Sequence, residues 1–297
     1  MPPRSNAAMS ENFPSRITGA RDPGDRRALH LDGPGGRVLV AQCGAQVLSW
    51  HHGNRNILWT ASNPEYVPGK PVRGGVPLVF PWFGDHPTDK KLPAHGFART
   101  LDWQSASTGP GPMVVLTTQD DANTRALWPH AFGLRFTVDV SDGLRLALEV
   151  ENRGAAPFSY EEALHTYFAV GDVHTATVHG LEGVRCTETA TAPETGWDPR
   201  APLRFRAETD RVFHGTPDRL ELRAPALRRT VELASTNARS AIVWNPWPAK
   251  TAKLSQMAAD DWTKFCCIET ANVKSEALTL APGARHTLEL RLQVGAG

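Results

Sequence analysis

Short alternating runs of apolar and polar residues, divided by turn residues, are the feature that most limits how this chain can fold. The run 144–150 places Leu144, Leu146, Leu148 and Val150 on one face of an extended strand. It follows the run 136–140 after a Ser-Asp-Gly turn, so the two runs predict a β-hairpin with one buried face. No long stretch repeats its apolar residues with the 3.6-residue period of an amphipathic helix.

The same pattern extends over most of the chain and predicts its fold class. The 25 glycines and 24 prolines fall mostly between the strand-like runs, where they indicate turns. Many short strands joined by turns predict an all-β sandwich or barrel, and 297 residues suffice for one large domain of this kind. We expect residues 1–28 to form a flexible N-terminal tail and residues 29–297 to form that domain. The further runs lie at 37–42, 45–50, 113–118, 230–233, 240–244 and 286–292.

The charge balance argues against two classes of partner. Lys and Arg together number 32 and Asp and Glu 31, for a formal net charge of +1. Bulk charge therefore gives no reason to expect binding to nucleic acid or to a membrane surface, and any anion site needs local arginines. No apolar run approaches the roughly 20 residues that span a bilayer, and no secretory segment opens the chain. We expect a cytoplasmic protein.

Metal and cofactor chemistry has no recognisable motif. Cys266 and Cys267 are adjacent, which is a poor geometry for chelating one metal and a strained one for a disulfide. The sequence lacks a phosphate-binding glycine loop, a His-Glu-x-x-His motif, a Gly-x-Ser-x-Gly motif and a Cys-x-x-Cys motif. We therefore expect neither a metal nor a cofactor.

The segment 73–84, which reads RGGVPLVFPWFG, is the least ordinary part of the sequence. Two glycines after Arg73 permit close backbone approach, and two prolines stiffen the path. An arginine held in this way could bind an anion or a sugar hydroxyl at the rim of a pocket. The alternative is a stiff connector with aromatic side chains in the core, and for Trp82 and Phe83 we favour that alternative.

Two shorter patterns also suggest binding residues. His95 precedes Gly96, and Arg99 follows four residues after the histidine, as in a substrate-facing loop, although a His-Gly pair alone is common. Asp210 precedes Arg211, and the pair taken alone indicates a surface ion pair.

His165 and Glu269 are the candidates for proton transfer. In an extended run 163–170, His165 would be half-buried, and the alternative is a histidine satisfied within a sheet. The preceding Glu161 and Glu162 could orient it, but solvated glutamates are the simpler interpretation. Glu269 follows the apolar run 265–268, so its pKa should be raised by desolvation, which suits a general base near neutral pH. The alternative is a solvated carboxylate at a strand end.

Taken together, these segments resemble the glucose-6-phosphate 1-epimerase (hexose-6-phosphate mutarotase) branch of the aldose 1-epimerase family. The matching segments occur in the family's order and cover roughly residues 30–295. They are 73–81, 95–99, 128–132, 164–168, 178–183, 210–212, 243–246 and 268–273.

The resemblance implies a large antiparallel β-sandwich of the galactose-mutarotase type. It implies that His165 is the general acid and Glu269 the general base, and that Arg73, Arg99 and Asp210 contact the sugar phosphate. We count His95 with these substrate contacts. The family often has glutamine where this chain has Ala94, so one substrate contact differs here.

The function expected on this basis is an isomerase acting on a small molecule. It would interconvert the α and β anomers of glucose 6-phosphate, or of a related hexose 6-phosphate, by acid–base opening and closing of the ring. We expect it to act as a monomer. Two alternatives remain, a mutarotase for unphosphorylated aldoses and a non-catalytic module that binds sugar phosphates.

Overall fold

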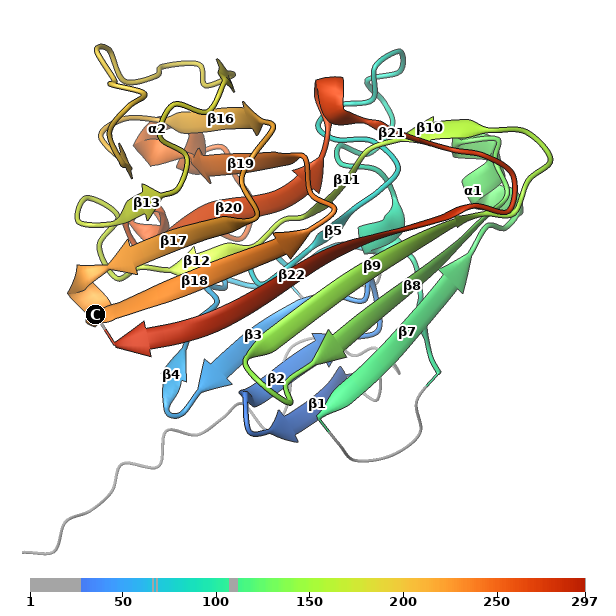
Figure 1. Ribbon diagram of the computed structural model, residues 1–297, viewed down its shortest axis with the longest axis horizontal. Helices are drawn as coiled ribbons and strands as arrows, with labels where there is room; N and C mark the ends of the chain where they lie inside the picture. The colour runs from blue at the N-terminus through green and yellow to red at the C-terminus, as the bar shows by residue number, and fades with distance from the viewer. Residues whose placement is uncertain (1–27, 66, 68, 107–111, 297) are drawn as a thin grey trace, which may run out of the picture.

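The computed structural model describes residues 28–65, 67, 69–106 and 112–296, and within them most of the regular secondary structure consists of antiparallel strands (Figure 1). This confirms the all-β prediction. The tail predicted at 1–28 lies, apart from Ala28, outside the described residues. The strands form two large sheets and two small ones.

The larger sheet has nine strands and includes the predicted hairpin as β8 and β9. Phe136 pairs with Leu148 across that hairpin, as the alternating pattern requires. In sheet order the strands are β15 (Leu203–Arg204), β13 (Thr177–His179), β17 (Arg219–Ala224), β18 (Arg229–Thr236), β22 (Arg285–Ala296), β9 (Leu144–Asn152), β8 (Phe132–Asp139), β7 (Met113–Gln119) and β6 (Gln104–Ser105).

The second large sheet has seven strands and is the one that carries the site. In order its strands are β14 (Cys186–Glu188), β16 (Thr209–His214), β19 (Ser240–Asn245), β20 (Phe265–Asn272), β11 (Glu162–Leu164) and β5 (Leu78–Val79), and β12 (Tyr167–Ala169) also pairs with β20.

Small elements complete the structure. One small sheet contains β1 (Ala28–Gly33), β2 (Gly36–Ala41), β3 (Val47–His52) and β4 (Arg55–Asn56), and the other pairs β10 (Phe158–Tyr160) with β21 (Leu278–Leu280). The helical segments are α1 (Ala122–Leu127), α2 (Trp247–Thr251), η2 (Ala98–Thr100), η3 (Pro225–Leu227), η4 (Asp261–Thr263) and η5 (Lys274–Glu276). Within the described ranges, none of the helices has the length and hydropathy needed to cross a membrane.

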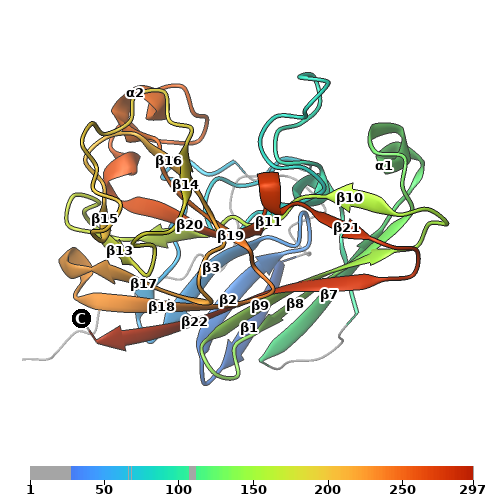
Figure 2. The same ribbon diagram turned by 45° about the horizontal axis from the view of Figure 1, so that its top comes forward.

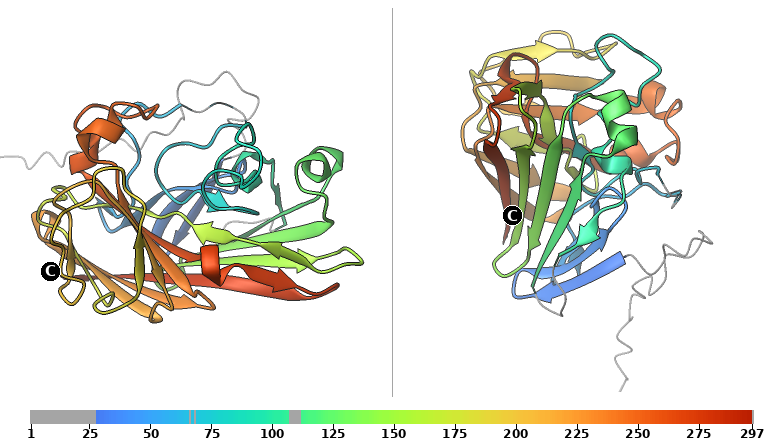
Figure 3. Two further views of the ribbon diagram at one scale, coloured as in Figure 1. Left: turned by 90° about the horizontal axis from the view of Figure 1, so that it is seen from above. Right: turned by 90° about the vertical axis from the view of Figure 1, so that its right-hand side faces the viewer.

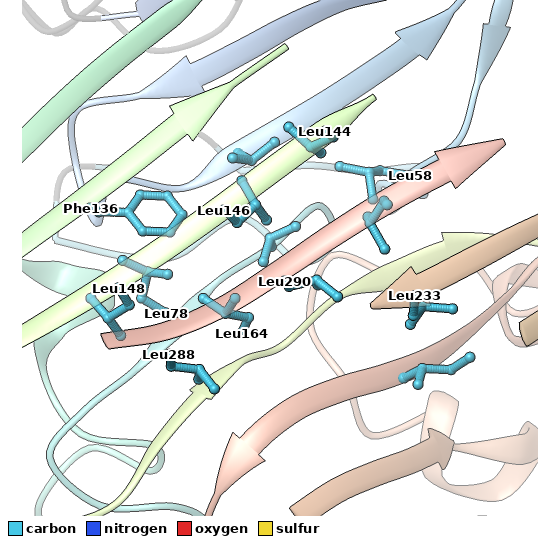
Figure 4. Close-up of a cluster of buried hydrophobic side chains, with 14 of the residues drawn as sticks. Leu58, Leu78, Phe136, Leu144, Leu146, Leu148, Leu164, Leu233, Leu288 and Leu290 are labelled. Atoms are coloured by element: carbon cyan, nitrogen blue, oxygen red, sulfur yellow. The ribbon is translucent and has the colours of Figure 1, made fainter. Parts of the chain in front are cut away.

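The main core lies between the two large sheets. Leu146 and Leu148 of β9 are fully buried beside their β22 neighbours Leu290 and Leu288. Leu164 of β11, in the other sheet, belongs to the same cluster (Figure 4). Each such side chain contributes roughly 1.5–3 kcal/mol through removal of apolar surface from water. The alternating leucines therefore join the two sheets.

The seven-stranded sheet is covered on both faces. All eight residues of β20 are buried. Ile268 packs into the main core, whereas Cys267 and Ala271 belong to a second cluster with Tyr167 and Ala163. Loops and the short helix α2 lie on the side of β20 away from the nine-stranded sheet (Figure 2). A polar side chain on this outer face is therefore enclosed by protein.

The segment 73–84 runs along the seven-stranded sheet and contacts the small sheet of strands β1 to β4. Val76 bridges to Val47, the first residue of β3, and Gly74 bridges to Thr60. In the right-hand view of Figure 3 the blue N-terminal strands lie at the bottom and the yellow strands at the top, and the segment contacts the N-terminal sheet through Val76 and the second large sheet through β5. Trp82 is buried with its indole N–H donated to the Pro93 carbonyl, which confirms the core assignment for that side chain.

Gly75 is where this packing needs a glycine. Its φ is +62°, and a Cβ there would lie 2.0 Å from the Val47 carbonyl oxygen. Gly75→Ala should therefore lower the free energy of unfolding by about 3 kcal/mol or more, because strain and overlap act together.

Gly53→Ala is the matched control for this prediction. Gly53 has a φ of +60°, but a Cβ at this position would have nothing within 4 Å, so only the backbone cost of about 1 kcal/mol applies. Urea denaturation of both variants measures the difference. Equal losses of unfolding free energy in the two variants would show that close packing at Gly75 does not matter.

Candidate active site

His165 and Glu269 face each other across adjacent strands. Leu164 pairs with Thr270 and Tyr167 with Cys267, so the register places His165 directly opposite Glu269. The His165 Nε2 and Glu269 Oε1 atoms are 3.3 Å apart. His165 is 7% exposed and Glu269 1%, which rules out the solvated alternative for Glu269.

The backbone at His165 differs from the continuous strand that the alternating pattern predicts. His165 and Thr166 separate β11 from β12. The His165 N–H donates to the Pro77 carbonyl (3.0 Å), and the Thr166 N–H turns back to the Leu164 carbonyl (2.9 Å). The strand breaks because the segment after Arg73 supplies a carbonyl here, yet the two-residue alternation continues through the break and keeps His165 on the face of Ala163 and Tyr167.

Burial shifts the two pKa values in opposite directions. Desolvation lowers the pKa of His165 from 6.5 to about 3, and the charges of Arg99 and Arg73 add to this effect. Desolvation raises the pKa of Glu269 well above 4.5, and the nearby Asp210 carboxylate raises it further. The raised pKa of Glu269 agrees with the sequence-based expectation. The free site therefore favours a neutral imidazole beside a protonated carboxyl group, with one proton on the pair.

Each member of the pair also has an unused polar atom. Among the described residues, no hydrogen-bond partner is found for His165 Nδ1 or Glu269 Oε2, although both atoms are buried. Buried polar atoms are normally hydrogen-bonded, and exceptions are frequent where a protein acts on a ligand. The pair can thus exchange a proton internally and still offer one atom each to a bound molecule.

Two arginines add positive charge beside the pair. The Arg73 backbone N–H donates to Gln256 Oε1 and its Nε–H to the Ser255 carbonyl, both at 3.0 Å. Arg99 donates from Nη2 to the Ala94 carbonyl at 2.6 Å. In the described part of the chain, neither guanidinium forms an ion pair with a carboxylate, so both charges can act on a ligand.

His95 forms one wall of the site. Its ring lies edge-on to that of His165, with 5.6 Å between the centroids. The Gly84 N–H donates to His95 Nδ1 (3.3 Å), and the His95 N–H donates to the Gly84 carbonyl (2.7 Å). Burial lowers the pKa of His95 well below 6.5, and the neighbouring cations add to the effect. His95 therefore presents a neutral imidazole.

Asp210 reaches the site from β16, two strands away from β20. Its carboxylate accepts a hydrogen bond from Lys250 Nζ of α2 at 3.3 Å. The interpretation of Asp210 and Arg211 as a surface ion pair is wrong, because successive side chains of a strand point to opposite faces. Arg211 is 1% exposed and pairs with Glu188 (2.6 Å).

The expected solvation of the glutamates before His165 is also wrong. Glu162 is fully buried and accepts a hydrogen bond from Asn272 Nδ2 at 2.9 Å. Glu161 is half-buried and accepts hydrogen bonds from the backbone N–H groups of Phe83 (2.7 Å) and Lys274 (2.6 Å). Both side chains stabilise the surroundings of β20, and no hydrogen bond joins either of them to the His165 ring in the described residues.

The structure adds Tyr167 and Lys250 to the surroundings of the six residues selected from sequence. The Tyr167 ring stacks on His165 with 4.9 Å between centroids and 12° between planes. Burial raises the pKa of the Tyr167 phenol. The two-residue alternation from His165 could have indicated Tyr167, but nothing in the sequence linked Lys250 to Asp210.

Comparison with known proteins agrees with this fold and gives the family. Residues 27–293 match the family model described as aldose 1-epimerase. A protein of Salmonella typhimurium described as "Putative glucose-6-phosphate 1-epimerase" is 32% identical over 260 residues, which are 86% of each chain.

Solved structures give the class of fold. The crystal structure of a protein described as a "putative mutarotase" from Salmonella typhimurium superposes with a TM-score of 0.79 at 29% identity, over 91% of this chain and 90% of that one. A galactose mutarotase-like protein from Lactobacillus casei superposes with a TM-score of 0.72 at 18% identity, over 90% of this chain and 100% of that one. The fold is therefore a galactose-mutarotase-like β-sandwich.

The chain belongs to the aldose 1-epimerase family, which confirms the resemblance seen in the ordered segments. Membership makes it an enzyme of the epimerase and mutarotase kind. The buried His165–Glu269 pair lies at a separation that acid–base chemistry on a bound molecule would require.

The raised pKa of Glu269 predicts that this carboxyl group costs stability at neutral pH. Its folded pKa lies above the unfolded value of 4.5. The stability contributed by the protonated carboxyl group is therefore fully present below pH 4.5 and is lost as the pH rises through the folded pKa. Glu269→Gln should therefore melt at a higher temperature than the wild type, by a margin that widens as the pH rises from 4.5 to 8.

Thermal melts across this pH range test the prediction, with the exposed Glu232→Gln variant as control. A margin that stays constant with pH, or equals that of Glu232→Gln, would contradict a raised pKa for Glu269.

Proposed function

We propose that this protein interconverts the α and β anomers of a hexose 6-phosphate, with glucose 6-phosphate as the first candidate. The observation that carries the proposal is the 3.3 Å separation of His165 and Glu269 beside two arginines without carboxylate partners in the described residues. The description of the Salmonella relative as a glucose-6-phosphate 1-epimerase supports the same substrate.

Ring opening needs one proton removed and one added. Glu269, as carboxylate, takes the proton of the anomeric hydroxyl while His165, as imidazolium, gives a proton to the ring oxygen. The bond between C1 and the ring oxygen breaks, and C1 becomes an aldehyde carbon. Rotation about the C1–C2 bond then presents the other face of the aldehyde. General acid and base contributions are each worth roughly 10²–10⁴-fold in rate.

Ring closure uses the opposite protonation state of the same pair. After opening, Glu269 holds a proton and His165 is neutral, which is the state that burial favours in the free site. This state returns a proton to the aldehyde oxygen and accepts one from the ring hydroxyl. The number of protons on the pair is the same in both states, so the cycle needs no net proton from solvent.

An anionic substrate would assist the opening step. The charges of Arg99 and Arg73 lower the pKa of His165. A phosphate dianion bound to these arginines would offset their charge and raise that pKa, so that the imidazole can carry the proton. His95 then contacts the sugar hydroxyls as a neutral imidazole, and Asp210 contacts them as a charged carboxylate. This coupling favours a phosphorylated sugar over an unphosphorylated one.

The two alternatives make different use of the same residues. A mutarotase for unphosphorylated aldoses would not need two arginines free of carboxylates. A non-catalytic module that binds sugar phosphates would not need a buried His–Glu pair with an unpartnered atom on each member. We therefore retain the anomer interconversion of a hexose 6-phosphate as the proposal.

Removing either member of the pair should abolish most of the activity. His165→Gln and Glu269→Gln should each lower kcat by about 10²–10⁴-fold with little change in KM, because proton transfer is lost and the arginines remain. An anomer-specific dehydrogenase coupled to freshly dissolved α-glucose 6-phosphate measures the relaxation rate. Full activity of either folded variant would contradict the assigned roles.

Removing the arginine charges should discriminate between substrates. Arg73→Met and Arg99→Met should each raise KM for glucose 6-phosphate by about 10- to 100-fold, the value of a charge-assisted hydrogen bond. Activity toward unphosphorylated glucose should change less than about 3-fold. Arg125→Met, at an exposed ion pair on α1, is the control. Equal effects on both sugars would favour the unphosphorylated aldose as substrate.

A further inference from the structure

Lys274 lies at the rim of the site on the segment that continues from Glu269. β20 ends at Asn272, and the short helix η5 begins at Lys274. The side chain is exposed, and within the described ranges no carboxylate lies in ion-pair distance of its ammonium group. Lys274 shares this property with Arg73 and Arg99, although the sequence analysis did not single it out.

Glu161 fixes the backbone of Lys274 in an unusual conformation. The φ of Lys274 is +58°, in the left-handed region that lysine rarely adopts. Its backbone N–H donates to Glu161 Oε1 at 2.6 Å, and the other oxygen of the same carboxylate accepts from the Phe83 N–H at 2.7 Å. One half-buried carboxylate therefore holds two rim segments together.

The Lys274 side chain extends toward the part of the site that His95 lines. Nζ donates to the Phe83 carbonyl at 3.3 Å and lies 5.4 Å from the centroid of the Phe83 ring. A Cβ on Gly84 would lie 4.0 Å from Nζ, and Gly84 is hydrogen-bonded to His95 in both directions. Phe83 in turn lies edge-on to His95 with 4.9 Å between centroids. The charge of Lys274 contributes to the lowered pKa of His95, as do those of Arg99 and Arg73.

Lys250 and Lys90, unlike Lys274, each form an ion pair with a carboxylate. Lys250 is paired with Glu208 at 3.1 Å and with Asp210 at 3.3 Å. Lys90 is paired with Asp85 at 3.4 Å. Among the residues that the structure describes, the ammonium group of Lys274 donates only to the Phe83 carbonyl, so it has donors left for another anion.

We propose that Lys274, held by Glu161, is a third cationic contact for the phosphate group of a hexose 6-phosphate, together with Arg73 and Arg99. The inference rests on the proposed function and adds one more residue that selects a phosphorylated substrate. A dianion needs more than one counter-charge, and a lysine with a long, mobile stem can follow the phosphate while the sugar ring opens and closes.

Lys274→Met removes the charge and keeps the length of the side chain. It should raise KM for glucose 6-phosphate by about 3- to 10-fold, the effect expected of one partly exposed charge, with kcat unchanged. KM for unphosphorylated glucose should not change, and Lys274→Arg should restore the wild-type KM. Lys90→Met is the matched control because that lysine already has a carboxylate partner. An unchanged KM for glucose 6-phosphate would overturn the inference, and so would an equal rise for both sugars.

Glu161→Gln tests the positioning role of the carboxylate. In the amide an NH2 donor replaces one of the two carboxylate oxygens, so it would face the backbone N–H of either Phe83 or Lys274. Because Phe83 and the His95 wall move as well, KM should rise for both sugars, unlike in Lys274→Met. A Glu161→Gln variant with wild-type KM for both sugars would show that the carboxylate does not position Lys274.

Binding of inorganic phosphate separates this inference from the proposed function. Titration calorimetry with inorganic phosphate should show about 3- to 10-fold weaker binding to Lys274→Met than to the wild type. If the wild type fails to accelerate anomer exchange of glucose 6-phosphate, the proposed function fails while the phosphate titration still decides the role of Lys274. If exchange is fast and phosphate binds both proteins equally, only the inference about Lys274 fails.

Discussion

The antiparallel pairing of β11 and β12 with β20 is the constraint on which the site depends. The register places His165 opposite Glu269, and strand neighbours on one face have their Cβ atoms within about 4.5–5.5 Å. A one-residue slip would turn Glu269 into the main core and expose Ile268 to the site. The leucines that fix the packing of the two large sheets therefore also fix the separation of His165 and Glu269.

Burial gives the pair its chemical character. A solvated histidine and glutamate at neutral pH would be a neutral imidazole and a carboxylate, with no proton between them. Enclosure by loops and by the second hydrophobic cluster raises the pKa of Glu269 and lowers that of His165, so both groups shift toward their uncharged forms. The same enclosure brings Arg73 and Arg99 close enough to act on His165. In the proposed mechanism, these few side chains couple the charge of the substrate to proton transfer.

Much of the fold could be predicted because it depends on local pattern. The hairpin of β8 and β9 follows from alternation around Ser-Asp-Gly, and both glycines after Arg73 have positive φ values in close contact with neighbouring backbone. The predictions that were wrong concern residues whose surroundings come from distant segments. Glu162 is buried because Asn272 meets it, and Asp210 separates from Arg211 because β16 lies in a sheet covered on both faces.

The sequence by itself determined the strand pattern, the absence of long amphipathic helices and the residue types of the site: His165, Glu269, Arg73, Arg99, His95 and Asp210. These are properties of local order and of side-chain chemistry. Only the tertiary structure decided that Lys250 pairs with Asp210 and that Glu161 joins Phe83 to Lys274. It also decided that burial holds the pair neutral, because desolvation and charge depend on which distant residues surround a group.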